Sequence, residues 1–135
     1  MRTAKVRGWL LDTHAMLWML YGDQRLSSRA SRIIEGNEPL AYSTVSFWEI
    51  ALKRSRKGFD FEIEADWDLF LPEELQRIGV ARWDIEAADC RKVESLPSCH
   101  NDPFDRMLIA QAEVRRFGLI TKDSAFVDYE VVTTW

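Results

Sequence analysis

Four acidic residues, far apart along the chain, have the types and positions that could do chemistry. Asp12 and Asp123 each follow a short apolar run, whereas Glu49 and Asp105 lie on the apolar faces of predicted helices. If folding brings them together, their charges need compensation, because like charges in a half-buried place require an added proton or a bound cation. A hard divalent cation held by oxygen ligands meets this need. Such an ion is typical of sites that act on phosphate groups.

Helical spacing directs two of these carboxylates toward the interior. On the helix predicted to begin at Asp102, Asp105 shares one face with three apolar residues, Leu108, Ile109 and Ala112. On the helix predicted over residues 44–57, Glu49 shares a face with Val45 and Leu52. A carboxylate on an apolar stripe faces the sheet rather than open water. We therefore expect both side chains to point inward.

Helix capping is the competing explanation for three acidic residues. Asp12, Asp102 and Asp123 precede or begin predicted helices, where aspartate is a favoured cap and meets the positive end of the helix dipole. For any one of them alone, capping explains the residue better than catalysis does. Glu49 and Asp105 fit capping less well, because acids within a helix or facing inward gain little from the dipole. The argument for a site is the convergence of the four.

The elements that would position these acids alternate between strand and helix. Short apolar runs predict strands at residues 9–11, 40–43, 80–82, 119–121 and 131–133. Helical patterns fall at residues 13–21, 27–37, 44–57, 66–76, 102–117 and from about 84 onward. Pro72 is expected to kink or shorten its helix, and Gly58 and Gly118 are expected to end theirs. This alternation predicts a parallel sheet between two helix layers. Ligands of such sheets bind beyond the carboxyl ends of the strands, where Asp12 and Asp123 fall.

Length and composition predict one soluble globular domain, spanning residues 1–135. No apolar run is long enough for a membrane span, and Asp12 and His14 interrupt the stretch that follows the basic start, so no secretion signal is expected. Cys90 and Cys99 lack the paired spacing of metal ligands, which predicts free thiols in a reducing cytoplasm. The net charge of −4 argues against a large non-specific nucleic-acid surface.

Four stretches of the chain, in this order and spacing, resemble the PIN-domain ribonucleases. They are LLDTHAMLW at 10–18, STVSFWEIAL at 43–52, HNDPFDRMLIAQA at 100–112 and LITKDSAF at 119–126. The closest likeness is to the VapC-type toxins of bacterial toxin–antitoxin pairs. The resemblance implies a PIN-like three-layer α/β/α sandwich with a short, mainly parallel central sheet. It also implies a metal-dependent endoribonuclease that acts as a toxin and is inhibited by a cognate antitoxin.

By that resemblance, Asp12, Glu49, Asp105 and Asp123 form an acidic pocket that binds one or two Mg²⁺ or Mn²⁺ ions. Asp12 and Asp105 are the expected direct ligands, with Glu49 and Asp123 binding directly or through water. The ion would lower the pKa of a bound water for in-line attack on phosphorus and offset charge on the leaving oxygen.

Four further residues are second-tier candidates. Asp102 either caps its helix or orients a water, and Thr121 is either a hydroxyl near the site or simply a strand residue. His14 either contacts substrate or is structural. Arg106 pairs either with a substrate phosphate or with Asp102.

Two groups of basic residues could follow the RNA backbone. One group crowds the end of the 44–57 helix: Lys53, Arg54, Arg56 and Lys57. The other consists of Arg25, Arg29 and Arg32. Favourable cations at a helix C-terminus explain the first group adequately, and a phosphate track is the functional alternative.

The helix predicted over residues 13–21 is apolar almost all round, and a small core cannot cover every side of it. Part of it is therefore expected to meet another chain. The resemblance offers a second copy, giving a homodimer, or a small VapB-like antitoxin lying in a groove near the acids. Leu17, Trp18 and Trp48 are assigned to that groove, the two tryptophans because aromatic residues dominate interface energies. Core packing is the competing explanation for Trp9 and Trp48.

Other classes of protein fit the sequence less well. A receiver domain, which Lys122 imitates, needs adjacent acids at its first strand end, but Leu11 and Thr13 flank Asp12. A phosphohydrolase with an aspartyl nucleophile needs a second aspartate where His14 stands. The TKD stretch echoes a guanine-binding motif, but the chain has no glycine-rich loop ending in Gly-Lys. A catalytically inactive PIN-like binding module is the remaining alternative, and retention of all four acids counts against it.

Overall fold

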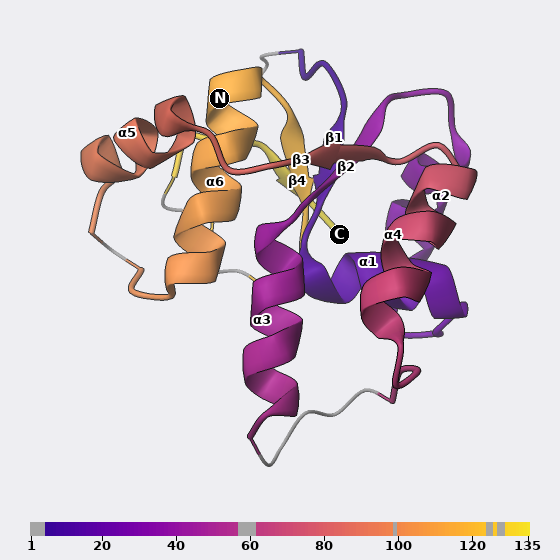
Figure 1. Cartoon of the computed structure of the whole chain (residues 1–135). Helices are drawn as coiled ribbons and strands as arrows, with labels where there is room; N and C mark the ends of the chain where they lie inside the picture. Colours follow the sequence, from indigo (N-terminus) through magenta and orange to yellow (C-terminus); the bar gives the residue numbers. More distant parts are fainter. Residues whose placement is uncertain (1–4, 57–61, 99, 124–125, 127–128) are drawn as a thin grey trace.

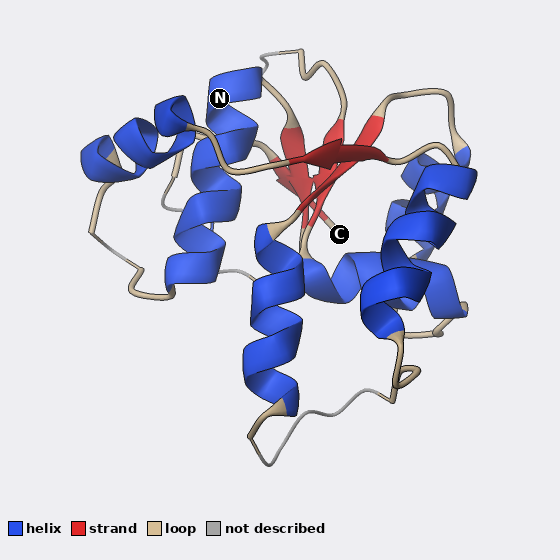
Figure 2. Ribbon diagram, viewed as in Figure 1, coloured by secondary structure: helices blue, strands red, loops and turns tan. Residues whose placement is uncertain are grey.

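A parallel sheet forms the centre of the molecule. The structure is a computed structural model, which describes residues 5–56, 62–98, 100–123, 126 and 129–135. Within these residues the strands are β1 (Trp9–Leu11), β2 (Leu40–Ser43), β3 (Ala81–Trp83), β4 (Gly118–Ile120) and β5 (Thr133–Thr134). They follow the order β3-β2-β1-β4-β5, and every neighbouring pair is parallel. Figure 2 shows the strands, in red, gathered between the helices. All carboxyl ends therefore lie at one edge.

Helices cover both faces of this sheet (Figure 1). They are α1 (Thr13–Tyr21), α2 (Ser28–Glu35), α3 (Val45–Arg54), α4 (Trp67–Arg77), α5 (Ala87–Ser95) and α6 (Pro103–Arg115). One core cluster joins the sheet to α1, α2 and α4, and the other joins it to α6. The predicted three-layer α/β/α sandwich is confirmed. In the part of the chain that the structure describes, no helix is both long and apolar enough to span a membrane.

Side-chain caps begin three helices where the sequence predicted starts. Asp12 accepts a hydrogen bond from the amide of Ala15 at 2.7 Å, and Ser27 caps α2 in the same way. Asp102 accepts from the amides of Phe104 and Asp105 at 2.9 and 3.1 Å. Each cap satisfies amides that have no partner within the helix. Because α1 starts directly after β1, its cap is fixed at the carboxyl edge of the sheet.

The last long helix does not end where the glycine pattern predicted. Arg116, with φ of 60°, is the left-handed residue that ends α6, and Gly118 instead begins β4. A Cβ added at Gly118 would lie 2.4 Å from the ring of Trp9. This glycine is therefore required by close packing against Trp9 and not by a helix stop.

Two other predicted boundaries also differ. Pro72 does not shorten its helix, because the hydrogen bond that it forfeits belongs to the carbonyl of the exposed Asp68, which water can satisfy. The helix predicted from about Asp84 begins at Ala87, where Glu86 and Asp89 form a capping box. Cys90 is a free, exposed thiol. The predictions for Gly58, Lys57 and Cys99 lie outside the described residues.

Candidate active site

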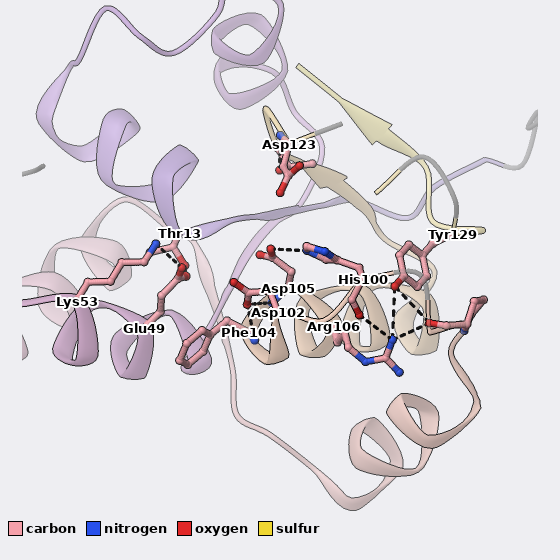
Figure 3. A network of polar contacts seen from close by, with 12 residues as sticks. Thr13, Glu49, Lys53, His100, Asp102, Phe104, Asp105, Arg106, Asp123 and Tyr129 are labelled. Carbon is pink, nitrogen blue, oxygen red and sulfur yellow. Dashed lines mark hydrogen bonds and ion pairs between the residues drawn. The ribbon is translucent and has the colours of Figure 1, made fainter. Parts of the chain in front are cut away.

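A pocket of about 500 Å³ opens at the carboxyl edge of the sheet. Its lining residues are Asp12, His14, Trp18, Arg25, Glu49, Lys53, Asp102, Asp105, Lys122 and Asp123. All four acids that the sequence singled out are among them, together with Asp102. They come from four separate segments: the end of β1, the middle of α3, the start of α6 and the turn after β4. Figure 3 shows four of them, Glu49, Asp102, Asp105 and Asp123. Folding therefore gathers these carboxylates in one place.

Burial makes two of these carboxylates hard to ionise. The pKa of Asp12 rises from its ordinary value of 3.8 to about 6, because burial outweighs the lowering effect of hydrogen bonds from Thr121 and the Ala15 amide. Burial likewise raises the pKa of Asp105 to about 6, and the neighbouring charges of Asp102 and Glu49 add to the rise. The side chains of the pocket thus leave negative charge uncompensated. This is the electrostatic condition that a bound cation relieves.

Glu49 is held by two partners that the sequence analysis did not assign to it. Its side chain is buried, and Oε1 accepts a hydrogen bond from the Thr13 hydroxyl at 2.5 Å. Oε2 forms an ion pair with Nζ of Lys53 at 2.8 Å. Burial lowers the pKa of Lys53, but the hydrogen bond and charge of Glu49 outweigh it and give a net rise. The i,i+4 spacing from Glu49 to Lys53 was a readable signal for this pair.

A histidine that the sequence analysis missed lies beside Asp105. Nε2 of His100 is 2.8 Å from Oδ2 of Asp105 (Figure 3). Ligand atoms of His100, Asp105 and Asp123 lie within 4.8 Å of one another. Asp123 itself is exposed, and its amide donates a hydrogen bond to the Thr121 hydroxyl at 3.1 Å. Thr121 therefore shapes the turn that presents Asp123, and its hydroxyl also reaches Asp12.

Arg106 is not placed as predicted. Its guanidinium donates hydrogen bonds to the carbonyls of Pro97 at 2.6 Å, Val93 at 3.1 Å and His100 at 3.3 Å. Among the described residues, its hydrogen bonds do not include Asp102, and it does not line the pocket. One step along a helix turns a side chain by about 100°. Arg106 therefore points away from Asp105 and binds the loop that leads into α6.

The pocket also has a basic and aromatic side. Trp18 has the Arg25 guanidinium carbon 4.8 Å and the Lys122 Nζ 6.0 Å from its ring centroid. The ring of His14 lies 5.4 Å from the same indole. Arg25 is also paired with Asp23 at 2.9 Å. One wall therefore presents cations to a pocket whose floor is acidic.

The three residues assigned to a partner groove lie in different environments. Leu17 is fully buried in the core, so its assignment to a groove is wrong: it lies on the side of α1 that faces the sheet. Trp18 is 6% exposed and lines the pocket. Trp48 is 55% exposed and meets Phe104 edge-on at 4.9 Å, so the core-packing explanation fails for it but is confirmed for Trp9.

Most of α1 is covered by its own chain. Its first two turns are buried, apart from the half-buried His14. Met19, Leu20 and Tyr21 in its last turn are half-buried. The expectation that one side of this helix meets another chain is therefore restricted to that last turn.

Comparison with known proteins identifies the family. Residues 9–132 match the PIN domain, and the chain belongs to the PIN-domain family. It is 30% identical to Ribonuclease VapC22 of Mycobacterium tuberculosis over 130 residues, which cover 93% of this chain and 97% of that protein.

Two solved structures share the fold. One is VapBC2 from Rickettsia felis bound to a DNA fragment from its promoter, with a TM-score of 0.65 at 13% identity, covering 94% of this chain and 98% of that chain. The other is a toxin–antitoxin complex from Klebsiella pneumoniae, with a TM-score of 0.60 at 20% identity, covering 95% of this chain and 98% of that chain.

Proposed function

We propose that this chain is the toxin of a toxin–antitoxin pair, an endoribonuclease that hydrolyses RNA phosphodiester bonds with the help of Mg²⁺ or Mn²⁺. The observation that carries the proposal is the convergence of carboxylates from four separate segments on one pocket at the carboxyl edge of the sheet. Its relative Ribonuclease VapC22 supports the choice of RNA as substrate. No observation favours the inactive binding module.

The donor atoms of the pocket fit a hard divalent cation. Asp12 and Asp105 are half-buried carboxylates whose pKa values burial raises to about 6, so a nearby cation offsets the cost of ionising them there. These two would hold the ion directly, and Glu49 and Asp123 would hold it directly or through water. A bound ion supplies two things there: it makes water more acidic and offsets charge on the phosphoryl oxygens.

The chain's own residues do the positioning. Lys53 and Thr13 fix both oxygens of Glu49, so this carboxylate keeps one orientation in the pocket wall. Lys122 and Arg25, beside Trp18, would receive the phosphates that flank the bond to be cut. The exposed Arg54 and Arg56 at the end of α3 would extend that path, as would Arg29 and Arg32 on α2.

A small VapB-like antitoxin is the proposed inhibitor. Trp48 projects from α3 next to Glu49 and is more than half exposed, which suits an aromatic anchor for a docked segment. Two structural relatives are themselves complexes of this kind. A homodimer through the last turn of α1 is the second proposed contact, and a cytoplasmic location follows from the same function.

RNA cleavage by the purified protein tests the proposal. Wild type should cut single-stranded RNA when Mg²⁺ or Mn²⁺ is added and stop when a chelator is added. Asp105→Asn should be folded and inactive. Asp68→Asn, which removes an exposed carboxylate of α4 outside the pocket, should cut like wild type. If folded wild type with metal leaves a broad panel of RNAs intact, or if cleavage persists in chelator, the proposal is wrong.

A further inference from the structure

A nitrogen donor lies beside two of the oxygen donors of the pocket, Asp105 and Asp123. Nε2 of His100 is 2.8 Å from Oδ2 of Asp105, and these two residues and Asp123 have ligand atoms within 4.8 Å of one another (Figure 3). That spacing allows one ion to contact all three side chains. Carboxylates alone would make the site an all-oxygen one, so the histidine changes its chemical character.

His100 is fixed from two sides. Arg106 donates hydrogen bonds to the His100 carbonyl at 3.3 Å and to the Pro97 carbonyl at 2.6 Å, which holds the main chain of this loop against α6. The imidazole ring packs edge-on against Phe126, with 5.9 Å between centroids, and Phe126 is fully buried. A ring held in this way loses little side-chain entropy when its nitrogen binds a metal ion.

We propose that His100 is a ligand of the metal ion, and that it biases the site toward a transition-metal ion such as Mn²⁺ over Mg²⁺. The inference rests on the proposed metal-dependent function and deepens it by choosing between the two ions. Mg²⁺ is a hard ion that prefers oxygen donors, whereas imidazole nitrogen is a donor that transition metals accept. His100, Asp105 and Asp123 would hold the ion together with Asp12.

The chain offers a matched control, because it has two histidines and the other, His14, lines the pocket to which Asp105 and Asp123 also belong. Protein without a polyhistidine tag is loaded with Mn²⁺, and pulsed electron paramagnetic resonance is used to detect a directly coupled ¹⁴N nucleus. Wild type and His14→Gln should show this coupling, and His100→Gln should lack it. In calorimetry, His100→Gln should weaken Mn²⁺ binding by about tenfold or more while changing Mg²⁺ binding by less than about twofold.

Several outcomes would overturn the inference. A wild-type spectrum without coupled nitrogen would overturn it by itself, because a histidine that only hydrogen-bonds to Asp105 gives no directly coupled nucleus. Loss of the signal in His14→Gln does so by assigning the nitrogen to the other ring. An equal loss of Mn²⁺ and Mg²⁺ affinity in folded His100→Gln would also overturn it. In these three cases metal-dependent cleavage by wild type persists and the proposed function stands. A wild-type protein that binds neither Mn²⁺ nor Mg²⁺ would overturn both.

Discussion

Asp105→Asn should stabilise the metal-free protein, although most substitutions of half-buried residues destabilise a fold. The side chain of Asp105 is 20% exposed, and its pKa is raised from 3.8 to about 6. Each unit of pKa shift corresponds to about 1.4 kcal/mol, so the ionised carboxylate costs the folded state up to about 3 kcal/mol at neutral pH. Asparagine keeps the shape and removes the charge. We expect the free energy of unfolding to rise by about 1 to 3 kcal/mol. The range extends below the full 3 kcal/mol because the neighbouring acids contribute part of the shift.

The pH dependence of this gain follows from the direction of the shift. The folded protein holds the Asp105 proton more tightly than the unfolded chain does, since the pKa is higher in the folded state. In wild type, the stability that comes from the tightly held Asp105 proton is therefore fully present below about pH 4. It is lost as the pH rises through about 6. The difference between variant and wild type should be near zero at pH 4 and complete by about pH 7.5.

Urea unfolding in the presence of chelator measures this difference across the pH range. Asp68→Asn, an exposed carboxylate on another helix, should show no comparable gain. Added Mn²⁺ should reverse the order of the variants, because only wild type binds the ion well and gains stability from it. A variant that is no more stable than wild type at pH 7.5 in chelator would refute the claim that the pocket carries uncompensated charge.

Three further substitutions test the surroundings of the site. Arg115→Gln leaves the fully buried Asp89 without the cation that lies 2.6 Å from it. The free energy of unfolding measured in urea should fall by about 3 kcal/mol while Mn²⁺ affinity stays unchanged, and unchanged stability would contradict the role of this pair. Gly118→Ala should lower the free energy of unfolding by about 1 to 3 kcal/mol, because the added Cβ meets the Trp9 ring. It should also alter the near-ultraviolet circular dichroism, and a variant that behaves like wild type would rule out that contact. Trp48→Ala should lower stability by about 0.5 to 1.5 kcal/mol, because it removes the edge-on contact with Phe104, and should weaken binding of the proposed antitoxin by about tenfold or more in calorimetric titration; unaltered binding would remove Trp48 from the interface.

The sequence predicted most of the fold because local chemistry marks its boundaries. Asp12 and Asp102 each combine a side-chain cap with the start of a helical pattern, and the structure confirms both caps. The Asp12 cap directly follows β1, so there the helix start and the position of the acid at the carboxyl end of a strand were predicted together. Glu49 was placed correctly in the pocket because its helical spacing puts it on a buried face.

The parts that were missed depend on contacts between distant segments. His100 lies in a loop without periodicity, and its place beside Asp105 depends on the hydrogen bonds that Arg106 makes to that loop. Helical periodicity cannot show where Arg106 points, because its partners come from residues 93–100 and from Tyr129. Leu17 was misassigned for a related reason: on a helix that is apolar all round, spacing does not say which side faces the sheet.

Locating the bound ion is the most direct test of the account. Crystals of the wild-type protein soaked in MnCl₂ should give one or two anomalous peaks in the pocket, in contact with the carboxylates of Asp12 and Asp105. The Asp105→Asn protein should lose this density under the same conditions. Mn²⁺ bound only elsewhere on the molecule, or a pocket that stays free of metal at saturating MnCl₂, would contradict the claim that these acids converge to hold a catalytic cation.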